Sequence, residues 1–262
     1  MVEVHHQEAI EKFVRLQQSD ETILAILLGG SLAHGFAAPD ADIDLLIIVE
    51  AAEYQKRKAA HKLAFSRWDL CNYPGGYIDC KVLSLDFLDA LRARGSDPAR
   101  YAFKDSIILF SRLDHLSTLL AEIARFPMED QAERRRRFAA QLLAWRWYYS
   151  EAVKKENQYL FYLAIQKIVL FSCRLVLNEN QMLYPYHKWL LKVVETAPLK
   201  PKAFDQALAK LLVAHNLNEV NQFSRDILDF VGLEEKNLDW ANQFMIDNEL
   251  NWMEHEAPVD DL

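Results

Sequence analysis

The residues in this chain best suited to chemistry begin with two adjacent glycines at the end of an apolar run. The run Ile23–Leu28 stops at Gly29, Gly30 and Ser31. Two glycines let a backbone turn tightly and approach a ligand without a Cβ in the way. If a helix begins at Ser31, its free N–H groups face the same space and favour an anion. The sequence therefore predicts a phosphate-binding turn.

Two carboxylates follow at a spacing that suits a strand. Asp42 and Asp44 open a second apolar run that continues to Val49, and the two-residue period of a strand places both side chains on one face. Neighbouring carboxylates repel each other unless a cation lies between them. A few hard oxygen ligands shared with substrate phosphates suit Mg²⁺. The chemistry implied is metal-assisted attack on a nucleotide phosphate.

The combination of the glycine turn with the acidic strand resembles the signature of the polymerase-β-type nucleotidyltransferase superfamily. In this chain the signature consists of Gly29, Gly30 and Ser31, followed by Asp42 and Asp44 between apolar residues. The resemblance implies that the glycines and the serine hold nucleotide phosphates. It also implies that the two aspartates bind the metal and take part in catalysis.

The same resemblance implies a third acidic residue on a later strand, and Asp79 is the candidate. An alternating run places Ile78 and Cys80 on one side and Asp79 with Lys81 on the other. A carboxylate in mid-strand costs free energy unless it is paired or bound to a metal. We expect Asp79 either to join the metal or to take a proton from the attacking hydroxyl, and Lys81 to contact the nucleotide. The alternative is a strand-edge carboxylate in water.

Hydrophobic periodicity predicts the elements that must position these residues. An amphipathic helix is expected over residues 5–18, beginning with two solvated histidines, His5 and His6. The other elements expected in the N-terminal part are strands over 23–28, 42–49, 77–83 and 106–110 and helices over 51–65 and 85–93. The later segments, all expected to be helical, are 128–153, 159–177, 187–196, 203–215, 217–230 and 238–253.

This change of pattern predicts two domains. A mixed-sheet α/β nucleotidyltransferase domain is expected over residues 1–112, and an all-α helical bundle over 113–262. The arrangement is similar to that of the adenylyltransferases that inactivate aminoglycoside antibiotics. That resemblance implies triphosphate contacts from the helical domain, with Lys188 at a helix start as the candidate. A surface lysine is the alternative. The run Arg134–Arg137 is expected to be a solvated helix face, and the alternative is that one or two of its arginines reach substrate phosphates.

Composition and charge limit the possible partners. Apolar residues make up 51% and charged residues 26% of the 262, and the formal net charge is −8. Both predicted domains contain more acidic than basic residues. A protein that grips long nucleic acid normally carries a basic stripe. The balance therefore argues against a polymerase or a tRNA-modifying enzyme.

The expected location is the cytoplasm, with no membrane partner. Residues 1–20 are charged and helical in pattern, unlike a signal peptide. The three cysteines have neither the spacing of a zinc site nor the even number of a disulfide framework. The apolar stretch Tyr159–Leu177 is long enough for a membrane span, but Gln166, Lys167 and Arg174 interrupt it. We expect it to be the central helix of a soluble bundle.

The predicted function is Mg²⁺-dependent transfer of a nucleoside monophosphate onto a hydroxyl of a small molecule, with release of pyrophosphate. The resemblance favours AMP from ATP. Two alternatives remain: transfer of AMP to a protein hydroxyl, and a non-catalytic nucleotide-binding or interaction protein that retains the fold. A protein that kept the fold but lost the chemistry would normally lack one or more of the carboxylates, whereas all three are present here. The acceptor, the base of the nucleotide and the oligomeric state stay open.

Overall fold

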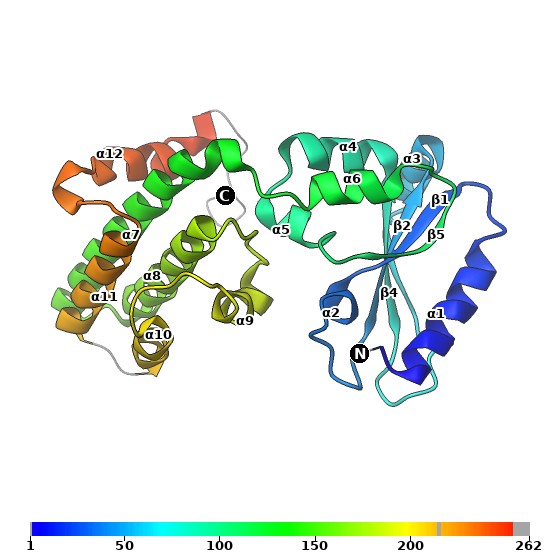
Figure 1. The fold of residues 1–262 in the computed structure, drawn as a ribbon, viewed down its shortest axis with the longest axis horizontal. Coiled ribbons are helices and arrows are strands. Elements are labelled where there is room, and N and C mark those ends of the chain that lie inside the picture. Colours follow the sequence, from blue (N-terminus) through cyan, green and yellow to red (C-terminus); the bar gives the residue numbers. More distant parts are fainter. Residues whose placement is uncertain (1, 214–215, 254–262) are drawn as a thin grey trace. The chain divides into compact units, whose positions relative to one another are not determined.

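A computed structural model describes residues 2–213 and 216–253 and divides the chain into two compact units (Figure 1). The units are Met1–Arg125 and Phe126–Leu262. The division thus falls later than the predicted boundary after residue 112. The physical reason is the helix α6 (Leu116–Ile123), which packs on the sheet of the first unit.

The first unit is built on a five-stranded sheet in the order β3-β4-β2-β1-β5. Its strands are β1 (Ile23–Leu28), β2 (Ile43–Val49), β3 (Ala64–Arg67), β4 (Ile78–Ser84) and β5 (Ile107–Ser111). Strands β2 and β4 run parallel, and the remaining pairs are antiparallel. This confirms the predicted mixed sheet.

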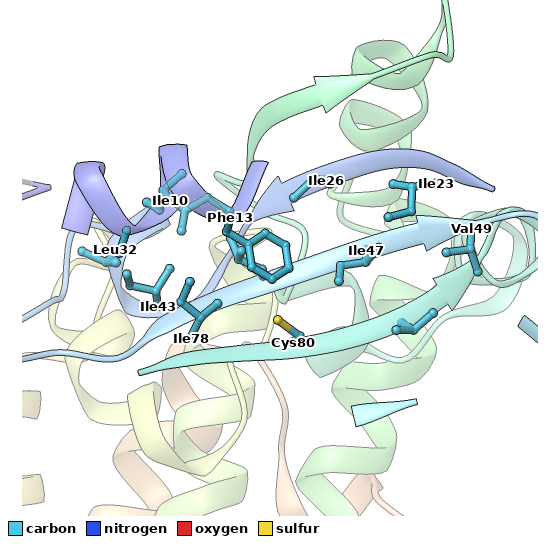
Figure 2. Close-up of a cluster of buried hydrophobic side chains, with 14 residues drawn as sticks. Ile10, Phe13, Ile23, Ile26, Leu32, Ile43, Ile47, Val49, Ile78 and Cys80 are labelled. Atoms are coloured by element: carbon cyan, nitrogen blue, oxygen red, sulfur yellow. The ribbon is translucent and has the colours of Figure 1, made fainter. Parts of the chain in front are cut away.

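One face of the sheet is covered by the N-terminal helix α1 (Val4–Gln17). Figure 2 shows Phe13 of α1 among apolar side chains of the strands, including Ile47 and Cys80. These residues are fully or almost fully buried. Burying a side chain of this size contributes about 1.5–3 kcal/mol, so α1 fixes this face of the sheet firmly.

The opposite face is covered by helices later in the chain. They are α4 (Leu85–Arg94), α5 (Asp97–Tyr101) and α6. Leu88 and Leu91 of α4 pack with Leu116, Leu120 and Ile123 of α6 and with alternate residues of β1 and β2. Helix α6 therefore completes the core of the first unit.

The predicted helix over 51–65 is too long. Helix α3 ends at Ala59, and the chain leaves it through His61, whose φ of 54° lies in the left-handed region. Residues Ala64–Arg67 then form the edge strand β3, which pairs with β4. Four residues with little apolar alternation give no local strand signal, and pairing with a formed neighbour decides their conformation.

The expectation of two solvated histidines is wrong for His6, whose residue is fully buried. Its Nδ1 accepts a hydrogen bond from the backbone N–H of Glu3, at 3.3 Å. Its Nε2 lies 3.2 Å from the carbonyl oxygen of Ala41 and donates to it. His5 reaches the carbonyl of Pro39 in the same way, at 2.8 Å. The start of α1 therefore holds the loop that leads into β2.

The second unit is helical in the part that the structure describes. Its α-helices are α7 (Gln131–Lys154), α8 (Gln158–Glu179), α9 (Leu190–Glu195), α10 (Phe204–Val213), α11 (Leu217–Phe230) and α12 (Trp240–Phe244). The expected solvated run at the start of α7 instead supplies cross-links. Arg135 makes two hydrogen bonds of 2.7 Å to Glu179 of α8, and Arg137 pairs with Asp247 at 2.9 Å.

Among the described residues, one helix, α8, is long and apolar enough to cross a membrane by length and composition. Half of its apolar window is buried within the protein. The buried positions include Ala164, Ile165 and Ile168, and the helix packs along α7. This is the packing expected of a core helix of the bundle.

The first prediction concerns the boundary. A polypeptide of residues 1–125 should unfold cooperatively in urea, whereas one of residues 1–112 should be strongly destabilised. Each apolar side chain lost with α6 contributes about 1.5–3 kcal/mol when buried, against a typical total stability of about 5–15 kcal/mol. Circular dichroism measures both transitions. Equal stability of the two polypeptides would show that α6 does not belong to the first unit.

The second prediction concerns pH. Burial, aided by the charge of His5, lowers the pKa of His6, so the unfolded chain binds the proton first. The stabilising effect of neutral His6 is complete above about pH 6.5, its unfolded pKa, and is lost as the pH falls below that value. The free energy of unfolding should therefore decline between pH 7 and 5.5. The decline should be much smaller in His6→Gln, and only slightly smaller in the comparison variant His5→Gln, which removes the lesser of the two causes.

Candidate active site

The glycine turn and the acidic strand lie at the same edge of the sheet. Strand β1 runs antiparallel to β2, with Leu28 opposite Leu45, so the end of β1 lies beside the start of β2. The backbone N–H of Gly29 donates to the carbonyl oxygen of Asp44 at 2.9 Å. The antiparallel pairing thus brings together two motifs that are separated in sequence.

The turn continues into a single helical turn, α2 (Gly30–Ala33), one residue earlier than predicted. Ser31 is buried, at 7% exposure. A helix of one turn has little macrodipole. Any anion held here therefore depends on individual N–H groups of the turn rather than on a helix dipole.

Gly30 is required by the closeness of its backbone to the Asp44 carboxylate. Its φ is +61°, and a Cβ added to it would lie 1.7 Å from Oδ2 of Asp44. That distance is far inside any van der Waals contact, so only glycine fits. The turn and the carboxylate therefore line one shared space.

Asp44 and Asp79 lie directly opposite each other on the parallel strands β2 and β4. Their side chains are 25% and 29% exposed. The ammonium group of Lys81 lies 3.8 Å from Oδ1 of Asp44 and 3.5 Å from Oδ2 of Asp79. The parallel register thus joins three of the predicted site residues, and a cation already lies near both carboxylates.

Asp42 precedes β2 and is held by an aromatic side chain. The phenol of Tyr77 donates to Oδ2 of Asp42 at 3.1 Å, and this hydrogen bond raises the pKa of Tyr77, so that it stays a donor at neutral pH. The hydroxyl of Tyr73 donates to the carbonyl of Ala41 at 2.8 Å, which His6 also contacts. Several distant side chains therefore fix the backbone just before Asp42.

The donors fit a hard divalent cation. Within the described residues, no three histidine, cysteine or acidic side chains converge closely enough to form a ready-made metal site. The fit rests instead on the donor chemistry. Asp42 and Asp44 are two residues apart, and Asp79 lies opposite Asp44 on the neighbouring strand. The ammonium group of Lys81 lies near the carboxylates of both Asp44 and Asp79. Carboxylate oxygens of this kind are the ligands that Mg²⁺ prefers.

Lys188 belongs to the second unit. It lies in the 3₁₀ turn His187–Trp189 that leads into α9 and is exposed, with its ammonium 5.2 Å from the ring centroid of Trp189. The preceding Tyr186 has a φ of +68°, which is a strained conformation for a bulky residue and is often found at functional turns. The contact of Lys188 with a nucleotide stays a prediction.

Several residues beside the site were not singled out from the sequence. Tyr77 could have been found, because it alternates with Asp79 along one strand face. Trp68 could not, because its ring stacks on Tyr77 only through the pairing of β3 with β4. His34, which ends α2, lies 3.2 Å from Oδ2 of Asp105 and packs against Tyr101. Those contacts span about seventy residues of sequence.

Comparison with known proteins gives one family match and one similar structure. Residues 7–73 match the family described as "Nucleotidyltransferase domain". The chain is also similar to the crystal structure of a nucleotidyltransferase-like protein from Exiguobacterium sibiricum. The sequence identity is 14% and the TM-score 0.49, over 96% of this chain and 81% of that chain. No curated protein matches the chain. The family match thus places a nucleotidyltransferase domain over residues 7–73, within the first unit.

Proposed function

We propose that the protein transfers AMP from ATP to a hydroxyl of a small molecule, with Mg²⁺ as the metal and pyrophosphate as the second product. The observation that carries the proposal is the position of Asp44. Its carboxylate lies opposite Asp79 and against the backbone of Gly30. One carboxylate thus adjoins both a phosphate-binding turn and a candidate proton acceptor.

The residues of the first two strands bind and orient the nucleotide. The backbone of Gly29 and Gly30 and the hydroxyl of Ser31 hold the outer phosphates. Asp42 and Asp44 hold the metal, with Tyr77 keeping the Asp42 carboxylate in place. When bound, a divalent cation neutralises charge that builds up on the phosphoryl oxygens.

Asp79 is placed to act on the acceptor. The acceptor oxygen forms a bond to the α-phosphorus as the bond from that phosphorus to its bridging oxygen breaks. The hydroxyl proton passes to a carboxylate oxygen of Asp79, a role that needs hydrogen-bond reach of that hydroxyl. In the alternative role, Asp79 would help to hold the metal. Lys81, beside both Asp44 and Asp79, contacts a phosphate of the nucleotide.

The third prediction tests this proposal. Asp44→Asn and Asp42→Asn should lower AMP transfer by about 10²-fold or more, the usual cost of losing electrostatic stabilisation of a transition state. Thermal stability should stay equal or rise, because one of two repelling carboxylates is removed. Transfer is measured as labelled pyrophosphate released from ATP with Mg²⁺, pooled acceptors and cell extract.

The control for that experiment is Asp86→Asn, which removes an exposed carboxylate from the first turn of α4. It should transfer at the wild-type rate. Substantial turnover by Asp44→Asn would exclude a metal-binding role for this carboxylate. A lost thermal transition would show that Asp44 is needed for folding instead.

The fourth prediction compares two glycines that both have positive φ. Gly30→Ala should abolish transfer and weaken nucleotide binding, because the added Cβ displaces the Asp44 carboxylate. Gly35→Ala is the matched control: its φ is +71°, but a Cβ there meets nothing within 4 Å. Its cost should be limited to backbone strain, about 1 kcal/mol. Calorimetry with an ATP analogue and Mg²⁺ measures binding. If both substitutions lowered nucleotide binding equally, the Gly30 backbone and the Asp44 carboxylate would not line one nucleotide site.

A further inference from the structure

An aromatic pair lies beside the carboxylates on the outer strands of the sheet. Strand β3 pairs with β4 so that Ser66 lies opposite Asp79 and Arg67 opposite Ile78. Trp68 directly follows β3, and Tyr77 directly precedes β4. Their rings stack with centroids 4.5 Å apart and an interplanar angle of 24°. By strand alternation, the stacked rings share a face with Ser66 and Asp79.

Both rings are held in place before any ligand arrives. Tyr77 is fixed by the hydrogen bond from its hydroxyl to Asp42. The residues that flank Trp68 are fixed by a two-pronged ion pair, in which Arg67 donates two hydrogen bonds of 2.7 Å to Asp69. The Trp68 residue is nevertheless 62% exposed. One indole face therefore rests on Tyr77 while most of the side chain is open.

The order of the strands separates this pair from the phosphate-binding turn. The turn follows β1, and the sheet order is β3-β4-β2-β1. Asp44 on β2 and Asp79 on β4 thus lie between the glycine turn on one side and Trp68 on the other. If the triphosphate lies at the glycine turn, the leaving group and the aromatic pair are on opposite sides of the carboxylates.

We propose that Trp68, supported by Tyr77, is the platform on which a planar ring of the acceptor stacks. This inference rests on the proposed transfer reaction and names its acceptor class: small aromatic or heteroaromatic alcohols. Two residues along a strand span about 7 Å. This is the distance along the strands between the Trp68–Tyr77 pair and the Ser66–Asp79 pair. The acceptor must therefore carry its hydroxyl on a side arm of the ring that reaches back along the strands to Asp79.

The experiment uses the full chain with Trp68→Ala, Trp68→Phe and a control, Trp147→Ala, which alters a 48% exposed tryptophan of the second unit. The first measurement is calorimetric binding of an ATP analogue with Mg²⁺. The second is transfer from ATP labelled at the α-phosphate to two pools. One holds benzyl alcohol, 2-phenylethanol and 4-hydroxybenzyl alcohol, and the other holds glycerol, erythritol and xylitol.

Label should enter the aromatic pool. Trp68→Ala should lower kcat/KM for those alcohols by about 10- to 100-fold, the usual effect of removing a stacking side chain. Trp68→Phe and Trp147→Ala should stay within about threefold of wild type, since phenylalanine keeps a ring to stack on. Affinity for the nucleotide should be unchanged in all three variants.

Three results would overturn the platform. The first is transfer by Trp68→Ala at the wild-type rate, and the second is label confined to the open-chain pool. The third is a loss of nucleotide affinity in Trp68→Ala as large as its loss of transfer, which would show that the base of the nucleotide stacks there instead. Failure of the transfer reaction is distinguished by saturation-transfer NMR with 2-phenylethanol. If wild type transfers to neither pool but binds this probe through Trp68, only the reaction is wrong. If wild type and Trp68→Ala give the same NMR signal, the platform is wrong whatever the activity.

Discussion

Holding two carboxylates side by side on neighbouring parallel strands is the constraint on which the first unit depends. Asp44 and Asp79 repel each other in the ionised state, and their register leaves no freedom to separate. The alternate residues of the same strands, such as Ile43 and Ile78, are fully buried against α1. Core packing on one face therefore fixes the unfavourable arrangement on the other, and Lys81 reduces its cost.

Side chains from several distant parts of the chain fix the backbone segment that leads to Asp42. The carbonyl of Ala41 receives His6 from α1 and Tyr73 from the loop before β4. Tyr77 then holds the Asp42 carboxylate itself. Each contact costs side-chain entropy. Together they order the backbone before Asp42 and the Asp42 carboxylate in advance, so that in the proposed reaction less binding energy would be spent on ordering the protein.

Different strands of the sheet carry different groups of the candidate site. Strand β1 ends in the glycine turn, β2 and β4 carry the carboxylates, and β3 brings Trp68 to the outer side. The proposed transfer requires the incoming hydroxyl and the departing pyrophosphate on opposite sides of the reacting phosphorus. The proposed platform beyond Asp79 and the glycine turn beyond Asp44 would satisfy that requirement within a single unit of the fold.

The sequence alone determined four of the five strands, the glycine turn and the carboxylates, because these follow from local rules: strand alternation, glycine freedom and charge spacing. The mixed sheet followed from the family resemblance. Only the tertiary structure showed that Asp44 faces Asp79, that Gly30 has no room for a Cβ and that His6 is buried. It alone placed α6 in the first unit and Trp68 beside Tyr77. Local patterns cannot specify such contacts, because they depend on strand register and on which segments pack together.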